Sequence, residues 1–247
     1  MAGATASSGG LKQIIQIEDS DDPRIDVFRN VRDRDLSGRH GGFIAEGEVV
    51  LRALARSRLH RAKSVLIADH RADRLTSLLD SFDATVSVYS AGQAVMDRIT
   101  GFHIHRGILA FGERSPEAKA ADLLGAVQGP ATVLILCGVS NHDNVGGVFR
   151  NAAAFGAAAV LLDSRCCDPL YRKAIRVSVG ATLLTPFAWL ADDEDPLALC
   201  AVYAFEPLAL SPGGAESRAE REPWLRAAVG IGSDGQGLPP GNHDRAR

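Results

Sequence analysis

The stretch ATVLILCGVSNHDNVGGVFRNAAAFGAAAVLLD, residues 131–163, decides the fold of this 247-residue chain. It opens with a continuous apolar run, which predicts a buried strand, and continues through a polar loop into an alanine-rich helix and a second apolar run. A strand, a covering helix and another strand are typical of a parallel sheet with helices packed on it. The chemistry of the loop between the first strand and the helix therefore decides the class of protein.

The glycines of this loop do not fit a dinucleotide-binding turn. In that turn the pattern G-x-G-x-x-G follows the strand directly and opens the helix. Here Gly138 follows the strand, but the next glycines are Gly146 and Gly147, and the polar segment between them is too long for a tight pyrophosphate turn. Asp163 is the one acidic residue at the following strand end. The sequence therefore argues against a nicotinamide- or flavin-binding fold.

Asn144 and Arg150 are the candidate functional side chains of the loop and helix. Asn144 is predicted to be the N-cap, with the helix running over 144–157. Gly146 would let another backbone or a ligand approach the first turn closely. Arg150 follows Asn144 by about a turn and a half, and the interpretation is that both face one cleft suited to a phosphate or a sugar hydroxyl. The alternative is a capped helix with a surface arginine.

Helix and strand signals alternate along the rest of the chain, which predicts two α/β units. The domains expected are a disordered tail (1–22), an α/β unit (23–112), a linker that holds one helical turn (113–129) and a second unit with a parallel sheet (130–247). Helices are predicted at 43–57, 74–82, 90–101, 144–157 and 168–180. Strands are predicted at 62–69, 84–90, 106–113, 131–139, 158–163, 181–187, 201–206 and 225–232.

The net charge of −3 gives no overall attraction to nucleic acid, but basic residues concentrate near the amino terminus. Between Arg24 and Arg74 twelve arginines and lysines face seven acidic residues. Arginine suits forked contacts with phosphate, so this segment is a candidate RNA-binding surface. A solvated helical face is the alternative.

The four cysteines, Cys137, Cys166, Cys167 and Cys200, lack the spacing of metal ligands, so no metal site is expected. They favour a reducing, cytoplasmic setting. The first ten residues contain no apolar core typical of a signal peptide, and no apolar run is long enough to predict a membrane span.

Asn144-x-Gly146-x-x-x-Arg150-x-Ala152 resembles the first motif of the SpoU/TrmH-type RNA 2′-O-ribose methyltransferases, members of the trefoil-knot SPOUT superfamily. Residues 173–186 resemble the segment that follows the second strand of that family, and residues 229–239 resemble its second motif, a strand ending in a glycine-rich loop. Residues 43–47 and 105–110 resemble the amino-terminal RNA-binding domain of many members. The resemblance covers roughly residues 25–239.

This resemblance implies a small L30e-like RNA-binding domain followed by an α/β-knot methyltransferase domain. The expected activity is methyl transfer from S-adenosylmethionine to a ribose 2′-hydroxyl of tRNA or rRNA, by a homodimer. Arg150 would be catalytic, Asn144 would shape the cleft, and His142 is a further candidate base. The cofactor would be bound by the glycine-rich loop, that is, by Gly232, Ser233, Asp234, Gly235, Gly237 and Leu238. The RNA contacts expected in the amino-terminal domain are Arg52, Arg56 and Lys63.

Two features depart from the family pattern. Asp234 stands where the family usually has Glu, which keeps the charge but shortens the reach. The third motif, Ser-Leu-Asn followed by a helix, is absent from this chain, so the expectation is a methyltransferase domain that is incomplete at its carboxyl end, without the knot. A non-catalytic RNA-binding protein, as a truncated or degenerate relative, is therefore the alternative function. An unrelated α/β nucleotide-binding protein is the third.

Overall fold

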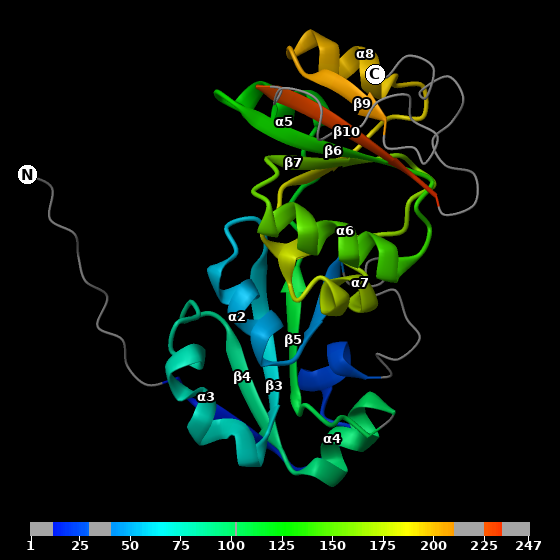
Figure 1. Ribbon diagram of the computed structural model, residues 1–247. Coiled ribbons are helices and arrows are strands. Elements are labelled where there is room, and N and C mark those ends of the chain that lie inside the picture. Colours follow the sequence, from blue (N-terminus) through cyan, green and yellow to red (C-terminus); the bar gives the residue numbers. More distant parts are fainter. Residues whose placement is uncertain (1–11, 30–40, 102, 210–224, 234–247) are drawn as a thin grey trace, which may run out of the picture. The chain divides into compact units, whose positions relative to one another are not determined.

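The computed structural model describes residues 12–29, 41–101, 103–209 and 225–233. The chain divides into two compact units, Met1–Arg114 and Ser115–Arg247, and each is described by itself (Figure 1). Across the described ranges, no helix combines the length and the apolar character that crossing a bilayer demands.

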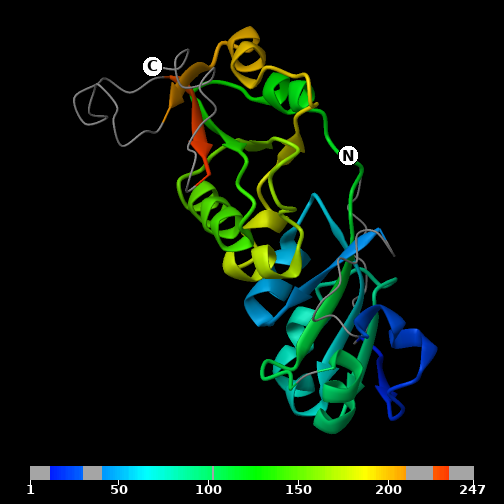
Figure 2. The same ribbon diagram turned by 90° about the vertical axis from the view of Figure 1, so that its right-hand side faces the viewer.

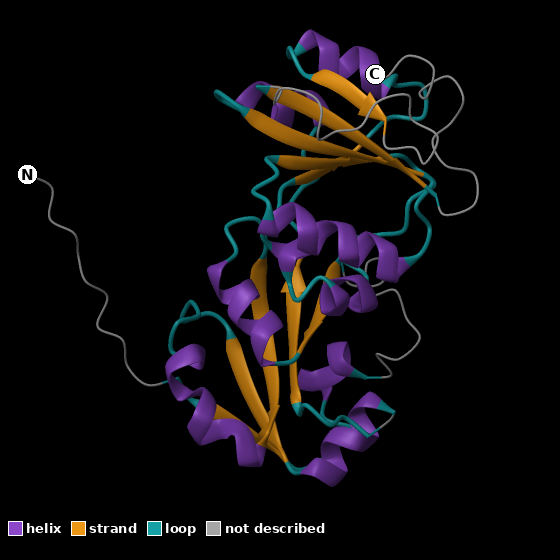
Figure 3. Ribbon diagram, in the orientation of Figure 1, coloured by secondary structure: helices purple, strands orange, loops and turns teal. Residues whose placement is uncertain are grey.

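The first unit is built on a five-stranded mixed sheet in the order β1-β4-β3-β5-β2. Strands β1, β4 and β3 run parallel, whereas β5 is antiparallel to both of its neighbours (Figure 3). The strands are β1 (Ile14–Ile17), β2 (Gly42–Glu46), β3 (Arg61–Ala68), β4 (Ser87–Ala91) and β5 (Ile108–Glu113). The predicted strands at 62–69, 84–90 and 106–113 are present, but the segment from Phe43 begins with β2, which the helix prediction over 43–57 missed.

The helices of this unit are η1 (Pro23–Phe28), α2 (Glu48–Arg56), η2 (Asp69–Arg71), α3 (Ala72–Leu79) and α4 (Gln93–Thr100). Helix α4 ends as the sequence predicts, because Gly101 adopts the left-handed conformation (φ 78°) that ends helices. The apolar face of α2 consists of Val50, Leu51, Ala53 and Leu54. The apolar spacing of Val49, Val50, Ala53 and Leu54 in the sequence predicts that Val49 shares this face, but its side chain is 59% exposed.

The segment 113–129, predicted to be a linker, contributes to the second unit. Helix α5 (Ala120–Ala126) lies within it, and Ala120 and Leu124 are buried in the core of the second unit. This part of the segment is therefore a structural element of that unit. A helical turn within the linker was predicted from the sequence, and α5 is the helix found there; its packing in the core was not predicted.

The second unit has a parallel five-stranded sheet in the order β8-β7-β6-β10-β9, as the alternating pattern predicts. The central strand β6 pairs with β7 on one side and along its whole length with β10 on the other. The strands are β6 (Ala131–Cys137), β7 (Ala159–Leu162), β8 (Phe187–Trp189), β9 (Glu206–Ala209) and β10 (Arg226–Gly232).

Helices cover both faces of this sheet, as Figure 2 shows. Helices α6 (His142–Ala154) and α7 (Arg172–Val177) pack against one another, and α6 covers the face that carries Leu136, Val160 and Leu162. Helices α5 and α8 (Pro196–Val202) cover the face that carries Val133, Ile135 and Leu161. Alternate residues of each strand point to opposite faces, which explains the two separate cores.

Two strand predictions in this unit were wrong. Segment 181–187 begins as a short 3-10 helix, η3 (Ala181–Leu183), and its strand, β8, starts only at Phe187. Most of segment 201–206 belongs to α8 and the turn after it, and strand β9 starts at Glu206. The signal for α8 is Asp195-Pro196: the carboxylate of Asp195 caps the helix and a proline occupies its first position.

Candidate active site

The strand order places the candidate site at the carboxyl ends of β6 and β10. From β6 the chain proceeds outward to β7 and β8, whereas β10 and β9 lie on the other side of β6. In open α/β sheets ligands bind outside the strand ends at this point of reversal. The register pairs Cys137, the last residue of β6, with Gly232, the last residue of β10. The loop before α6 and the glycine-rich segment therefore begin side by side.

The N-cap of helix α6 lies three residues earlier than the sequence prediction places it. The N-cap is Asn141, whose side-chain oxygen accepts a hydrogen bond from the Asp143 backbone N–H at 2.8 Å. Asn144, predicted to be the cap, lies inside the first turn and is half-buried. Asparagine is a suitable N-cap at either position, 141 or 144, and the helix begins after the first of the two.

Asn144 and Arg150 do not project from the same side of α6. Six residues at about 100° each separate them by about 120° around the helix axis. Asp143 and Arg150 are seven residues apart and do share a face. Arg150 is exposed and, within the part of the chain that the structure describes, makes no hydrogen bond or ion pair. Its guanidinium is therefore available to a ligand.

The two adjacent glycines of α6 have different surroundings. A Cβ atom on Gly146 would lie 2.8 Å from the Ala174 carbonyl oxygen and 2.8 Å from the Val177 Cβ atom, so α7 packs directly on the helix backbone there. The close approach expected at Gly146 is thus made by the chain's own α7. A Cβ atom on Gly147 would meet nothing within 4 Å. This open surface lies one turn before Arg150.

The first turn of α6 is also attached to α7 through side chains. The rings of His142 and Tyr171 are in contact, with centroids 4.1 Å apart and planes tilted by 36°. The Lys173 ammonium lies 2.6 Å from the carboxylate of Asp143. His142, a candidate base from the sequence, is therefore packed against an aromatic ring at the start of the helix.

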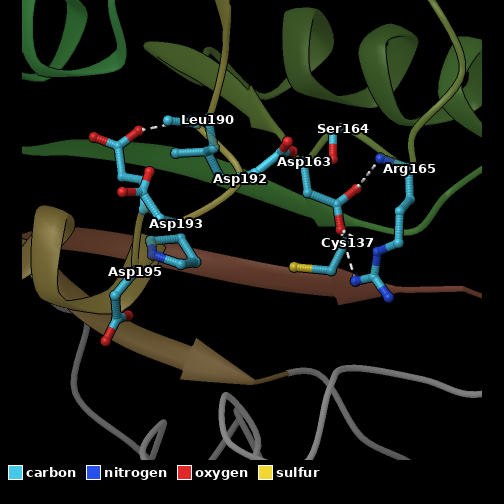
Figure 4. Close-up of a pocket in the computed structure, with 11 residues that line it drawn as sticks. Cys137, Asp163, Ser164, Arg165, Leu190, Asp192, Asp193 and Asp195 are labelled. Atoms are coloured by element: carbon cyan, nitrogen blue, oxygen red, sulfur yellow. Dashed lines mark hydrogen bonds and ion pairs between the residues drawn. The ribbon is translucent and has the colours of Figure 1, made fainter.

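Asp163 connects the loops that follow β6 and β7. Its two carboxylate oxygens accept hydrogen bonds from the Gly138 backbone N–H at 2.9 and 3.0 Å. The Arg165 guanidinium forms an ion pair with the same carboxylate at 2.7 Å, as Figure 4 shows. Burial raises the pKa of the Asp163 carboxyl, but the hydrogen bonds from Gly138, Arg165 and Cys166 outweigh it, so the pKa lies below its usual value. The carboxylate is thus ionised and engaged within the protein.

A cavity of about 470 Å³ opens beside this carboxylate at the ends of β6, β7 and β8 (Figure 4). Its volume is in the range of small-molecule sites. The lining includes Cys137, Asp163 and the acidic segment 192–195, so its charge disfavours a phosphate group. Among the described residues no group of three or more His, Cys, Asp or Glu side chains is arranged to hold a metal ion.

The structure describes two of the predicted cofactor-binding residues. Gly232 ends β10, and Ser233 follows it; both are half-buried. The remaining predicted cofactor-binding residues lie outside the described residues, and these are Asp234, Gly235, Gly237 and Leu238.

The predicted RNA contacts all belong to the first unit and are exposed. Arg52 forms an ion pair with Glu48 at 2.7 Å along α2, and Lys63 forms one with Glu113 at 2.9 Å across the sheet. Arg56, at the end of α2, has no ion-pair partner in the described ranges. Of the three cations, Arg56 is therefore the one whose charge is not paired with a carboxylate among the described residues.

Sequence reasoning missed the residues that hold α6 in place, namely Asp163, Tyr171 and Lys173. The sequence indicates Asp163 only as an acidic residue at a strand end, where a dinucleotide-binding fold has a carboxylate. A signal existed in the polar sequence between β7 and α7, because carboxylates directly after a buried strand often bind nearby backbone N–H groups. Nothing in the sequence indicates which N–H is bound.

The comparisons with known protein families and with individual relatives agree on one family. The profile of the SpoU rRNA Methylase family matches residues 131–247. An uncharacterized tRNA/rRNA methyltransferase of Mycobacterium bovis is 38% identical over 232 residues, which cover 89% of this chain and 77% of the relative. A relative with the same description from Mycobacterium avium is 31% identical over 169 residues, covering 67% of this chain and 55% of the relative.

Solved structures show the same fold. The AdoMet-bound rRNA methyltransferase from Sinorhizobium meliloti superposes with a TM-score of 0.75 at 18% identity, covering 94% of this chain and 86% of that protein. The SpoU methyltransferase AviRb from Streptomyces viridochromogenes, in complex with the cofactor AdoMet, superposes with a TM-score of 0.74 at 15% identity, covering 91% of this chain and 86% of that protein.

Proposed function

Because this chain belongs to the SpoU rRNA methylase family, we propose that it transfers a methyl group from S-adenosylmethionine to a ribose 2′-hydroxyl of tRNA or rRNA. The observation that carries the proposal is the arrangement at the strand reversal. An exposed arginine, Arg150, projects from a helix that begins beside the glycine-rich end of β10. The relatives that share 38% identity over most of the chain are named tRNA/rRNA methyltransferases, so the non-catalytic alternative is not favoured.

The end of β10 fits a cofactor site. Gly232 has no side chain, and it lies beside Cys137 at the point where a ligand can reach two strand ends together. We assign cofactor binding to Gly232, Ser233 and the loop that follows, with Asp234, Gly235, Gly237 and Leu238. S-adenosylmethionine supplies a methyl group activated by its sulfonium.

Arg150 is the proposed catalytic residue, and Asn144 is proposed to shape the cleft. Arginine keeps its proton in proteins, so Arg150 is suited to hold a ribose hydroxyl or the adjacent phosphate and to stabilise negative charge that develops on the oxygen. Two directed N–H donors also orient the hydroxyl for attack. The open surface at Gly147 leaves room for a nucleotide next to Arg150.

RNA binding is assigned to the first unit through Arg52, Arg56 and Lys63, which are exposed cations on α2 and at the start of β3. A homodimer and a cytoplasmic location complete the proposal. The homodimer rests on the family resemblance, and the cytoplasmic location rests on that resemblance and on the four free cysteines.

The test is methyl transfer from labelled S-adenosylmethionine to unmodified tRNA and rRNA transcripts by the wild-type protein and two variants. Arg150→Ala is expected to lower kcat by about 100- to 1,000-fold, the usual loss when one donor to a developing oxyanion is removed. The matched control is Arg176→Ala, an exposed arginine on α7, which is expected to keep wild-type activity. Activity retained by Arg150→Ala would overturn the catalytic assignment. RNA binding without any transfer by the wild-type protein would favour the alternative function.

A further inference from the structure

The connection between β7 and α7, residues 163–171, runs along the loop between β6 and α6 and contacts it repeatedly. The Asp163 backbone N–H donates to the Leu136 carbonyl at 3.1 Å, and the Cys167 N–H donates to the Val139 carbonyl at 3.0 Å. Between these two contacts the Asp163 carboxylate receives the Gly138 N–H. Hydrogen bonds therefore join the two segments at Leu136, Gly138 and Val139, where β6 ends.

The contacts continue past the loop into the first turns of α6. They comprise the ring contact of His142 with Tyr171, the ion pair of Asp143 with Lys173, and the packing of Gly146 on α7. A single continuous segment thus holds one side of the helix start, on the face that Asp143 shares with Arg150. His142 and Arg150 belong to one continuous helix, so a displacement of its first turn would also displace Arg150.

The carboxylate of Asp163 makes several hydrogen bonds within this segment. Besides the Gly138 N–H, its carboxylate accepts the Arg165 backbone N–H at 3.2 Å and the Arg165 Nη2 at 2.7 Å, and the Cys166 thiol lies 3.2 Å away. Gly138 has a positive φ of 66°, so the chain turns sharply at the residue that the carboxylate holds. The next residues form the loop that leads to the cap of α6, and the end of β10 lies directly beside the turn.

We propose that Asp163 is a positioning residue for methyl transfer: its carboxylate fixes the turn at Gly138 and thereby sets the start of α6 and the placement of Arg150 relative to the end of β10. This role deepens the proposed function and rests on it. Asp163 does not touch the substrate in this role. It acts through the backbone of Gly138, and its substitution impairs the chemical step more than RNA binding.

The first experiment compares kcat and KM for RNA among wild type, Asp163→Ala and Asp163→Asn. Asp163→Ala is expected to lower kcat at least ten-fold, with KM for RNA changed less than three-fold, because Arg52, Arg56 and Lys63, which are assigned to RNA binding, belong to the other unit. Asp163→Asn keeps an oxygen that can accept the Gly138 N–H, so it is expected to recover most of kcat. Equal impairment by the two variants, or a kcat for Asp163→Ala within two-fold of wild type, overturns the proposal.

The matched control is Asp195→Ala, which removes another carboxylate that holds backbone N–H groups at the edge of the same cavity. Asp195 caps α8 by accepting hydrogen bonds from the Leu197 N–H at 3.0 Å and the Ala198 N–H at 3.2 Å, and α8 lies on the opposite face of the sheet from α6. This variant is expected to lose thermal stability while keeping kcat. A fall in kcat equal to that of Asp163→Ala would show that general loss of stability explains the effect, and would overturn the proposal.

The second experiment needs neither RNA nor cofactor. Hydrogen exchange of the backbone amides in 138–146 is expected to accelerate at least ten-fold in Asp163→Ala, with little change in α8 or in the first unit. Unchanged exchange in 138–146 refutes the proposal that Asp163 fixes the turn at Gly138. If the wild-type protein shows no methyl transfer, the proposed function fails, and the exchange result still decides whether Asp163 holds this turn.

Discussion

The adjacent glycines of α6 provide a sharp prediction, because alanine at the two positions should change stability in opposite directions. In Gly146→Ala the new methyl group would lie 2.8 Å from a backbone oxygen and 2.8 Å from the Val177 Cβ atom, neither of which can rotate away. Overpacking of this kind costs about 2–3 kcal/mol, at the upper end of its usual range, because α6 and α7 have to separate. Alanine regains about 1 kcal/mol through its higher helix propensity. The expected net loss is about 1–2 kcal/mol.

Gly147→Ala is the matched control. Its methyl group would meet no atom within 4 Å, so only the gain in helix propensity, about 1 kcal/mol, remains. The two variants should therefore differ by about 2–3 kcal/mol, or by about 8–12 °C in the melting temperature at roughly 4 °C per kcal/mol. The protein has two tryptophans, Trp189 and Trp224, and both fall in the sequence of the second unit. Trp189 ends β8, so its fluorescence reports on the sheet of this unit; Trp224 lies outside the described residues.

Thermal and urea unfolding followed by tryptophan fluorescence measures this difference. A Gly146→Ala protein as stable as Gly147→Ala would refute the packing of α7 on the α6 backbone. Activity gives a second comparison. If a nucleotide occupies the open surface beside Arg150, Gly147→Ala should raise stability while lowering methyl transfer, and a more stable variant with full activity would show that nothing binds there.

The remaining predictions concern RNA binding and pH. Arg56→Gln should weaken RNA binding and reduce the slope of log K against log salt by about 0.7–0.9, the contribution of one phosphate contact. Lys63→Gln should reduce it less, because Lys63 is already paired with Glu113; filter binding between roughly 50 and 200 mM salt measures both slopes, and equal effects would contradict this ranking. A hydrogen bond from Arg24 lowers the pKa of Asp22 from 3.8 to about 2, so its stabilising contribution, complete above pH 4, should disappear as the pH falls toward 2. An Asp22 carboxyl that titrates near its ordinary pKa in the folded protein by NMR would refute that contact.

The sequence by itself determined three strands of the second unit, β6, β7 and β10, and the residue types of the helix that follows its central strand. The apolar runs of β6, β7 and β10 are long enough to be identified locally, and the stop of α4 at Gly101 follows from glycine's tolerance of positive φ. The short strand β8 and helix α8 were predicted wrongly because few residues carry their signal, and the packing of the surrounding core decides their conformation.

Only the tertiary structure decided which distant residues meet. Cys137 and Gly232 are neighbours because β10 pairs with β6, and no local pattern specifies strand order. Asp163 binds the Gly138 N–H, and Gly146 rather than Gly147 faces α7, because the helix and the following connection pack in one particular rotation. Propensity and periodicity depend on residues a few positions apart, whereas these contacts depend on the assembled sheet. The sequence therefore identified the residues that could act, and the fold decided how they are held.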